Sequence, residues 1–322
     1  MKQKSRLLYL KQYLEENSDE QHPLTLAEIV EHIEAVGFVC GRKSIKADLD
    51  QLTDSGVDIV CNKSRELHYF VGDRHFELPE LKMLTDAVQA SKFIPARKSK
   101  QLISKLAAFA SKHQAIELKR TLYTDKPVKS SNENIFYTVD LLHAAINTKT
   151  KITFKYYEYT SLKKKIYKHN KQNYIFSPYG LIWNSDNYYV VGYSDSHGKV
   201  STFRVDRIAS PKATEKPAVP KPNTLDMSVY ARSVFQMFDG AERDVIIKCT
   251  NTHMKSVIDR FGEGVKTEVL DAEHFCIYVR VSASPTFYGW IFGFAGQMEI
   301  VAPKEVKNEY VSLARLVAEK AD

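Results

Sequence analysis

The sequence predicts a multidomain α+β protein, and three successive patterns along its 322 residues support that class. Apolar residues first recur at helical spacing. Short aromatic and β-branched runs then follow one another between residues 150 and 208, and strand and helix patterns alternate after residue 240. A chain of this length accommodates two or three domains, at roughly 100–200 residues each.

The first 75 residues predict three short helices followed by a β-hairpin. Leucines recur at helical spacing over residues 7–14, and residues 25–28 have the Thr-x-x-Glu form of a capping box, which marks the start of a second helix. Residues 41–52 predict a third helix, and two strands around a polar tip are expected at residues 57–60 and 67–71. These are the parts of a winged helix-turn-helix, whose third helix enters the major groove of DNA.

Polar and basic side chains lie where such docking needs them. The candidate DNA-binding residues are Arg42, Lys43, Ser44 and Lys46 in the third helix and Lys63 and Arg65 in the wing. Residues 1–75 nevertheless carry 10 basic and 13 acidic groups, whereas DNA-binding domains are usually basic. A three-helix protein-interaction module therefore stays an alternative interpretation.

The middle of the chain changes from helical to strand periodicity. Residues 76–119 predict a pair of helices that is broken at Pro95. These helices would connect residues 1–75, which we call the head, to the rest of the chain and help the head to dimerise. Another helix is expected over residues 134–146, and five aromatic strands follow within about 55 residues. Because closure removes exposed strand edges, these strands suggest a small barrel. Two stretches with the composition of linkers flank this region, residues 124–134 and the proline-rich residues 210–223.

Residues 174–208 resemble the WYL domain of bacterial transcriptional regulators. The resemblance rests on Ser-Pro-Tyr-Gly-Leu from residue 177, Asn-Tyr-Tyr-Val-Val-Gly-Tyr from residue 187 and Phe-Arg-Val-Asp-Arg-Ile from residue 203. The Trp-Tyr-Leu triplet that names the domain is Tyr-Tyr-Val here, so only Tyr189 is retained, and Ala47 stands where the family's recognition helix commonly has Arg. The family's order of winged helix-turn-helix, helical connector, Sm- or SH3-like barrel and C-terminal WCX extension would cover nearly the whole chain.

The resemblance implies that the barrel senses a ligand, which in some members is single-stranded nucleic acid or a nucleotide. It implicates Tyr189, Arg204 and Arg207. Guanidinium groups bind phosphate and tyrosine rings stack on bases, so the candidate ligand-binding residues are Tyr156, Tyr179, Tyr189, Arg204 and Arg207. A group of nearby lysines would extend the positive surface: Lys163, Lys164, Lys165 and Lys168. The competing interpretation is that Arg207 pairs with Asp206 or a backbone carbonyl as structural support and that most of these tyrosines are barrel core.

The last block of the chain has the order of a ferredoxin-like domain with one added helix. From residue 244 the pattern predicts strand, helix, strand, strand, helix, strand and a final helix. Such a domain would mediate dimer contacts or close over the barrel. Three of its aromatic residues are expected in the core: Trp290, Phe292 and Phe294.

Composition and charge narrow the function classes. The chain is 43% hydrophobic and 26% charged, lacks the run of about 18 apolar residues that a membrane-spanning helix needs, and begins without a signal-peptide pattern. Residues 76–131 carry 11 basic and 5 acidic groups and residues 132–215 carry 12 and 7, a surplus that fits either an anionic partner or a solubility device.

The cysteines and the missing catalytic motifs argue against an enzyme. Four widely spaced cysteines, expected to be small core residues, predict neither a zinc ribbon nor a disulfide framework: Cys40, Cys61, Cys249 and Cys276. Cys40, just before the basic helix, is the candidate for redox chemistry. The sequence has no HExxH, GxSxG or P-loop motif, so we predict no catalytic residue, no metal and no cofactor. A nuclease assembled from distant carboxylates stays an alternative.

These patterns together predict five segments. They are a winged helix-turn-helix (1–75), a helical connector (76–133), a WYL barrel (134–212), a linker (213–240) and a WCX-like domain (241–322). The function hypothesis is a cytoplasmic, homodimeric, sequence-specific DNA-binding transcriptional regulator. It would bind an inverted-repeat operator, and a nucleic-acid or nucleotide effector at the barrel would change its DNA affinity. The alternative is a single-stranded DNA or RNA binding module with the barrel as its main site.

Overall fold

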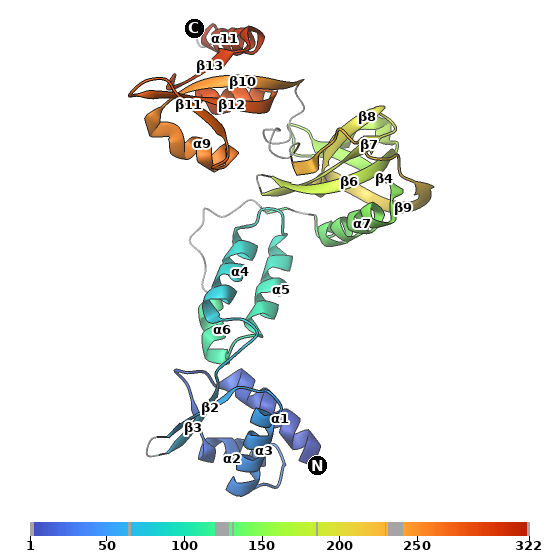
Figure 1. Cartoon of the computed structure of the whole chain (residues 1–322). Helices are drawn as coiled ribbons and strands as arrows, with labels where there is room; N and C mark the ends of the chain where they lie inside the picture. The colour runs from blue at the N-terminus through green and yellow to red at the C-terminus, as the bar shows by residue number, and fades with distance from the viewer. Residues whose placement is uncertain are drawn as a thin grey trace. The chain divides into compact units, whose positions relative to one another are not determined.

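The computed structural model confirms an α+β protein, which divides into two compact units, residues 1–133 and 134–322 (Figure 1). The structure describes residues 3–63, 66–119, 129–130, 132–184, 186–228, 230 and 241–320. No helix within these ranges is both long and apolar enough to cross a membrane.

The first unit begins with three helices and a small antiparallel sheet. The helices are α1 (Gln3–Asn17), α2 (Leu26–Ala35) and α3 (Arg42–Asp54), and the strands β1 (Leu24–Thr25), β2 (Ile59–Lys63) and β3 (Leu67–Val71) lie in the order β1-β3-β2. The capping box is present, with Thr25 and Glu28 exchanging hydrogen bonds at the start of α2. Apolar side chains from all three helices form one buried core: Leu10, Leu14, Ile29, Ile33, Ile45, Leu49 and Leu52.

A buried ion pair connects α1 to α3. The Arg6 guanidinium donates two hydrogen bonds to the Asp48 carboxylate, from Nε at 2.6 Å and from Nη2 at 3.0 Å. The side chain of Asp48 is only 2% exposed and that of Arg6 only 12%. Because removing one partner of a buried pair leaves an uncompensated charge, this ion pair fixes the position of α3 against α1.

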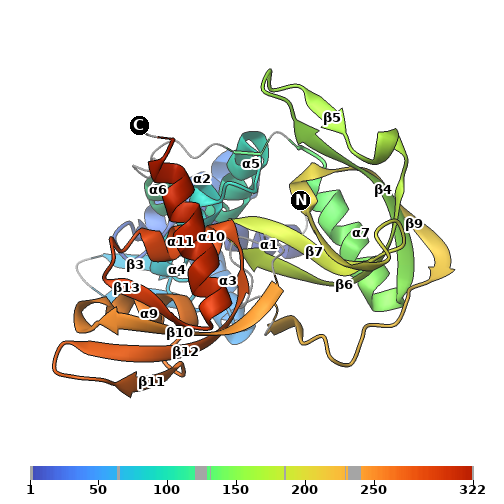
Figure 2. The same ribbon diagram turned by 90° about the horizontal axis from the view of Figure 1, so that it is seen from above.

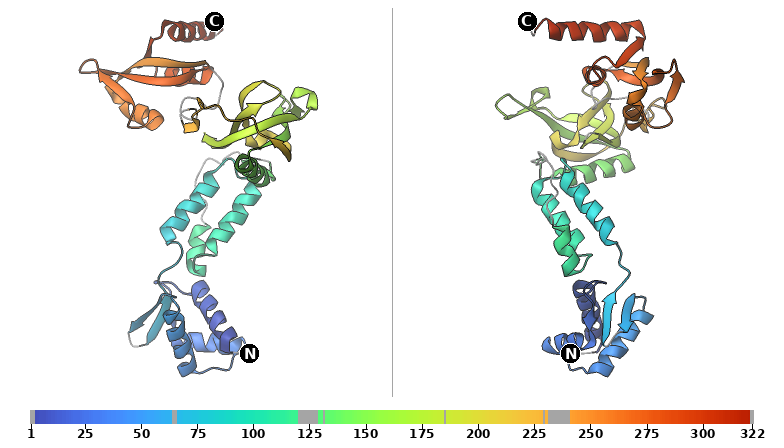
Figure 3. Two further views of the ribbon diagram at one scale, coloured as in Figure 1. Left: turned by 45° about the vertical axis from the view of Figure 1, so that its right-hand side comes forward. Right: turned by 90° about the vertical axis from the view of Figure 1, so that its left-hand side faces the viewer.

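Three helices follow the head, where the sequence predicted two. They are α4 (Leu78–Ala90), α5 (Ala96–Ala107) and α6 (Lys112–Leu118), and Figure 3 shows α4 and α5 running side by side. The additional boundary arises at Ser111, whose side chain accepts a hydrogen bond from the backbone N–H of Gln114 and so begins a new helix. Pro95 separates α4 from α5 as the sequence predicted.

Asp19 joins the head to these connector helices. Its carboxylate is almost fully buried and accepts hydrogen bonds from the Ser111 hydroxyl and from the backbone N–H groups of Gln21 and His22. His22 Nδ1 lies 2.8 Å from the carboxylate, and the His22 ring stacks on His113 with centroids 3.9 Å apart. Burial raises the pKa of Asp19, but the hydrogen bonds from Ser111 and His22 outweigh burial and hold that pKa below its ordinary value.

Replacing Asp19 with asparagine is expected to lower the stability of the first unit in a pH-dependent way. Since the folded pKa lies below the unfolded value of about 3.8, the carboxylate stabilises the fold fully above that pH, and the stabilisation is lost as pH falls toward the folded pKa. We expect Asp19→Asn to cost about 1–2 kcal/mol near neutral pH and progressively less in acid. Urea unfolding at neutral and at acidic pH tests this, and an equal cost at both would contradict it.

The second unit opens with a helix on a curled sheet. Helix α7 (Ile135–Thr148) is followed by β4 (Thr150–Tyr159), β5 (Lys165–Tyr167), η1 (His169–Lys171), β6 (Tyr174–Asn184), β7 (Asn187–Ser194), β8 (Lys199–Arg204), η2 (Val205–Arg207) and β9 (Ile208–Pro217). The strand order is β5-β4-β6-β7-β8, and β9 also pairs with β4. The one-turn helix η2 leads directly from β8 to β9, which pairs with β4, and the sheet curls over a core that includes Phe154, Phe176 and Phe203.

Backbones approach closely where β6 pairs with β7. A Cβ atom on Gly192 would lie 2.1 Å from the Ser177 carbonyl oxygen and 2.7 Å from the Phe176 ring, so only glycine fits there. Opposite it, the register shifts between Pro178 and Gly180. Residues 174–176 and 179–183, which the sequence predicts as two of its five aromatic strands, therefore belong to one bulged strand, with Tyr179 at the bulge.

The proline-rich stretch after residue 210 differs from the expected linker. Residues up to Pro217 continue β9, and the next ones remain bound to the sheet. The backbone N–H of Ala218 donates to the Lys149 carbonyl, and that of Val219 donates to the Ser177 hydroxyl at 3.0 Å. We call residues 218–228 with Tyr230 the strap.

The C-terminal part has the strand order of a ferredoxin-like sheet. Its elements are β10 (Ala241–Thr250), η4 (Asn251–His253), α9 (Met254–Phe261), β11 (Lys266–Val269), β12 (His274–Ala283), α10 (Pro285–Phe292), β13 (Met298–Ala302) and α11 (Lys304–Ala318). The antiparallel strands lie in the order β11-β12-β10-β13. Trp290 and Phe294 pack against the core as predicted, but the prediction is wrong for Phe292, whose side chain is 63% exposed on the outer face of α10.

The cysteines are free thiols in different environments. Cys249 and Cys276 are buried, and burial together with Cys276 raises the pKa of Cys249 to about 12. The core prediction is wrong for Cys61, which is exposed on β2. Burial and the charge of Glu34 raise the pKa of Cys40, which disfavours the reactive thiolate and argues against a redox role.

Candidate nucleic-acid and effector sites

The first turn of α3 carries exposed cations. Arg42, Lys43 and Lys46 are exposed, Ser44 is half-buried, and among the described residues none of the three cations pairs with a carboxylate. The helix has no acidic residue in its first turn, and its N-cap is Gly41, which offers no side-chain cap. Cations are unfavourable at the positive end of a helix dipole, whereas an anion there would be stabilised by both the cations and the free backbone N–H groups. The arrangement is suited to a phosphate or another strong hydrogen-bond acceptor.

The structure describes only part of the β2–β3 hairpin, which the sequence predicts to be a wing. Strands β2 and β3 pair in register from Ile59 with Val71 to Lys63 with Leu67. The side chain of Lys63 and the whole of Arg65 lie outside the described residues. Their assignment to the phosphate backbone of DNA stays a prediction.

In the second unit, a guanidinium and a carboxylate lie together where β8 ends. Arg204 donates to Asp206 from Nε at 3.0 Å and from Nη2 at 2.9 Å, and Nη2 also donates to the Asn187 side-chain oxygen at 2.7 Å. Burial lowers the pKa of Arg204, but the hydrogen bonds and charge of Asp206 outweigh burial and raise it. The guanidinium of Arg204 is therefore already satisfied within the protein.

Arg207 is different, because no hydrogen bond or ion pair joins its guanidinium to the described residues. It is half-buried, and its charge acts on the hydroxyls of Tyr156 and Tyr189. Burial raises the pKa of both tyrosines, which keeps them protonated and able to donate hydrogen bonds. The Tyr156 hydroxyl accepts a hydrogen bond from the backbone N–H of Arg204 at 3.3 Å. We call Tyr156, Tyr189, Arg204 and Arg207 the arginine–tyrosine cluster.

Tyr179 lies apart from this cluster. Its hydroxyl donates to the Pro220 carbonyl at 3.1 Å, so it holds the strap rather than facing Arg207. The structure thus brings together four of the five candidate ligand-binding residues. The ring of Tyr189 is nevertheless buried in a core cluster and that of Tyr156 packs against Tyr174 and Phe203, so the interpretation of the tyrosines as core residues is confirmed for these two rings. The alternative that pairs Arg207 with Asp206 is wrong, since Arg204 takes that carboxylate.

The strap covers the sheet face on which Tyr189 and Arg204 lie. Tyr189 is the cross-strand partner of Arg204, and Val191 is that of Thr202, so the four side chains share one face. Tyr230 and Met227 pack against Tyr189, Ile182 and Val191. The hydroxyls of Tyr230 and Thr202 are hydrogen-bonded at 2.9 Å. An effector at the arginine–tyrosine cluster would therefore lie beside the strap.

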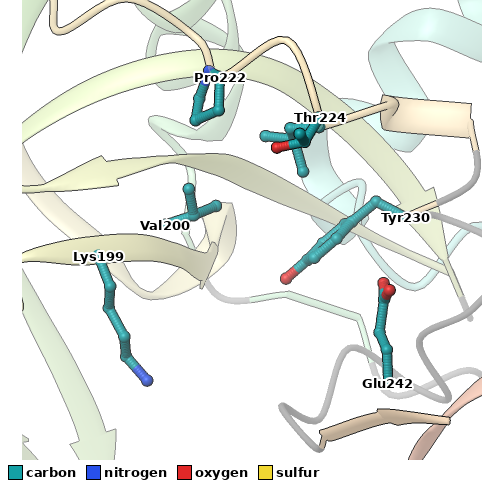
Figure 4. A pocket seen from close by; sticks show the side chains of 7 residues that line it. Lys199, Val200, Pro222, Thr224, Tyr230 and Glu242 are labelled. Atoms are coloured by element: carbon teal, nitrogen blue, oxygen red, sulfur yellow. The ribbon is translucent and has the colours of Figure 1, made fainter.

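A hollow of about 580 Å³ borders the strap. Figure 4 shows Pro222 and Thr224 on one rim and Lys199 on another. Its other lining residues are Val200, Leu225, Tyr230 and Glu242, which include none of the candidate ligand residues. The hollow holds one cation and one carboxylate, so its charge does not favour an anionic ligand.

Sequence reasoning missed the residues that support the cluster. Asn187 and Asp206 orient Arg204, and Tyr157 donates to the Asp206 carbonyl at 2.9 Å. The Arg-Val-Asp-Arg spacing signalled that Asp206 would pair with one of the two arginines, but not with which one. Within the part of the chain that the structure describes, no three His, Cys, Asp or Glu side chains are placed to hold a metal ion.

Two family models match within the second unit of the chain. The WYL domain model matches residues 137–213 and the WCX domain model matches residues 241–318. The comparison with curated proteins gave no match. The structure of proteasome accessory factor B/C (PafBC) of Arthrobacter aurescens is similar at 17% identity and a TM-score of 0.28, over 96% of this chain and 47% of that one. The chain therefore spans about half the length of that protein.

A second similar structure is the crystal structure of a CRISPR Cas-related protein. It shares 12% identity at a TM-score of 0.38, over 99% of this chain and 83% of that one. At these sequence identities and TM-scores, neither solved structure supports a conclusion about the function of this chain.

Proposed function

We propose that this chain, which carries a WYL domain and a WCX domain, is a homodimeric, sequence-specific DNA-binding transcription regulator whose affinity for duplex DNA changes when an effector binds the arginine–tyrosine cluster. The proposal assigns residues 1–75 to a winged helix-turn-helix with α3 as its recognition helix. The activity is regulatory rather than enzymatic.

One observation carries the DNA-binding part: the exposed cations in the first turn of α3, unpaired among the described residues. Arg42 and Lys43 have the chemistry to bind guanine edges or phosphates, and Ser44 can hydrogen-bond to either. The ion pair between Arg6 and Asp48 supports the proposal because it holds α3 rigidly on the core, as base readout requires. Titration of duplex DNA with the full chain tests it, since binding must weaken when these cations are removed.

The effector part rests on Arg207. A half-buried guanidinium without a partner among the described residues, beside two tyrosine hydroxyls that retain their protons, matches the phosphate of an anionic ligand. We therefore propose a nucleic acid or nucleotide, whose phosphate Arg207 would bind, as the ligand class.

The strap supplies a route from this site toward the C-terminal domain. It packs on Tyr189, and the chain continues from it to β10. An effector that moves Tyr189 would change the packing of Met227 and Tyr230. Hydrogen exchange of residues 218–228 with and without an oligonucleotide measures this, and unchanged protection would exclude the strap as the route.

An apolar face on α10 and α11 supports the homodimer. Phe292, Leu316 and Val317 are 63%, 48% and 67% exposed, and they line a groove of about 340 Å³ between the two helices. Leu313, Leu316 and Val317 have the i, i+3, i+4 spacing of a helix-pairing stripe. We propose that a second copy covers this groove, since a two-fold operator requires two copies of α3.

Replacing Phe292 and Leu316 together with aspartate is expected to give a monomer. Both side chains are exposed, so the melting temperature should change little, whereas duplex affinity should fall because one head contacts only one half-site. Sedimentation measures the mass, and Val269→Asp, at an exposed position on β11, is the matched control. A dimeric double variant would place the interface elsewhere.

The second candidate function is single-stranded DNA or RNA binding at the curled sheet as the main activity. The same Arg207 favours it. It differs in its expectation that the α3 cations contribute nothing to affinity.

A further inference from the structure

The end of β4 and the short strand β5 form a two-stranded arm. Tyr157 pairs with Tyr167, and Tyr159 pairs with Lys165. Hydrogen bonds between Thr160 and Lys164 close the turn. Among the described strands, β5 pairs only with β4, and Figure 2 shows the ribbon extending beyond the other strands. We call residues 157–168 the β4–β5 arm.

The arm exposes apolar and aromatic side chains that a solvated ribbon does not need. Tyr159 is 51% exposed, Ile166 52% and Leu162 75%. The ring of Tyr157 lies between those of Tyr159 and Tyr167, at centroid distances of 5.7 Å and 6.2 Å. The outer two rings of this row are accessible, and an accessible tyrosine ring is a stacking surface for a base.

The charge of the arm is strongly positive. Residues 155–171 contain six lysines and one acidic residue, Glu158, which pairs with Lys168 at 2.8 Å. Among the described residues, Lys163 and Lys164 have no carboxylate partner. The ammonium of Lys165 lies 4.3 Å from the Tyr157 ring centre. Cations alternating with aromatic rings match a phosphate backbone that carries bases.

The arm is continuous with the arginine–tyrosine cluster. Tyr157 forms the link, because its ring carries Lys165 and its hydroxyl donates to the backbone carbonyl of Asp206. Asp206 directly precedes Arg207. A ligand held at Arg207 that is long enough would therefore reach the arm.

We propose that the β4–β5 arm is a second binding surface for single-stranded nucleic acid, with Lys163 and Lys164 at phosphates and Tyr159 and Tyr167 under bases. It deepens the effector site and rests on that part of the proposed function, because the strand extends from Arg207. The effector is then a strand of several nucleotides, and a mononucleotide would occupy only the cluster.

The test measures binding of labelled oligothymidylates of increasing length, up to about twelve nucleotides, and of thymidine monophosphate to the full chain. Affinity should rise with length in the wild type. Tyr159→Ala with Tyr167→Ala should lower the affinity for the longest strand at least about fivefold, and should leave the affinity for the monophosphate unchanged.

Lys163→Gln with Lys164→Gln should lower the slope of log affinity against log salt by about 1.4, because two phosphates of the strand are no longer neutralised. The control is Lys212→Gln with Lys216→Gln, two exposed lysines on β9 that remove the same charge from the same sheet. Wild-type affinity for the strand in the arm variants, or an equal loss of affinity in the control, would overturn the proposal that the arm binds single-stranded nucleic acid.

Two further outcomes separate the arm from the cluster. Loss of binding in Arg207→Ala but not in the arm variants would retain the effector site and reject the arm. Loss of binding in the arm variants but not in Arg207→Ala would retain the arm as a binding surface and reject the effector site at the arginine–tyrosine cluster. Stronger binding to vesicles of phosphatidylserine than to oligothymidylate would assign the arm to a membrane surface and contradict the proposal.

Discussion

Replacing Arg42 and Lys43 together with alanine is expected to weaken duplex binding at least about thirtyfold without destabilising the head. Each cation that binds a base edge or phosphate contributes about 1–3 kcal/mol of recognition. Both side chains are exposed, and each repels the positive end of α3, so their removal should raise helix stability slightly, by a few tenths of a kcal/mol. Lower affinity together with unchanged or higher stability is the signature of a binding residue.

The matched control is Arg97→Ala with Lys100→Ala. This pair also comprises one arginine and one lysine, exposed near the start of α5, which likewise has no acidic residue in its first turn. Fluorescence anisotropy against a labelled duplex over a salt series measures affinity and its salt slope, which should fall by about 0.9 for each phosphate that the variant no longer neutralises. Retained affinity in the α3 variant would reject α3 as the recognition helix and favour single-stranded binding at the sheet.

The second large effect distinguishes two arginines three residues apart. Arg204→Ala breaks the ion pair with Asp206 and the hydrogen bond to Asn187, and we expect it to cost about 2 kcal/mol, or a melting temperature lower by about 4–8 °C. Arg207→Ala removes no hydrogen bond or ion pair among the described residues, so its melting temperature should stay close to that of the wild type. Binding of an oligothymidylate of about twelve nucleotides should fall at least about tenfold in Arg207→Ala.

Thermal unfolding and anisotropy on the same preparations separate stability from binding. Arg207→Lys is the informative intermediate, because it keeps the charge but loses the planar fork that holds a phosphate by two hydrogen bonds. A destabilised Arg207→Ala would make this residue structural. If Arg207→Ala binds the oligonucleotide with wild-type affinity, the effector does not bind at the arginine–tyrosine cluster.

The sequence predicted the fold class well where apolar spacing alone determines the element. The helix expected after the first strand of the last block forms as α9, and the capping box at Thr25 marks the start of α2. The prediction failed where the pairing of strands distant in the sequence determines the secondary structure. Pro211 and Pro217 favoured a linker, yet both lie in β9. Among the described strands β9 pairs only with β4, and an edge strand tolerates residues without a backbone N–H.

The site was predictable by residue type but not by partner. The tyrosines and arginines were chosen for their chemistry, and four of them do come together. Which arginine takes Asp206 depends on the turn of η2, which brings the Asp206 carboxylate to the Arg204 guanidinium and leaves Arg207 unpaired among the described residues. Phe292 was assigned to the core from its aromatic type, whereas its side chain is largely exposed and lines the groove that we propose a second copy covers.

Selection of random duplex DNA by the purified full chain, followed by sequencing, tests the central claim most directly. A homodimer with one α3 per half-site should enrich an inverted repeat whose half-site centres lie about 10 base pairs apart, or a multiple of that spacing. The α3 variant should lose the enrichment. Absence of any enriched duplex, together with tight binding to single strands, would contradict the regulator and place the main activity at the curled sheet.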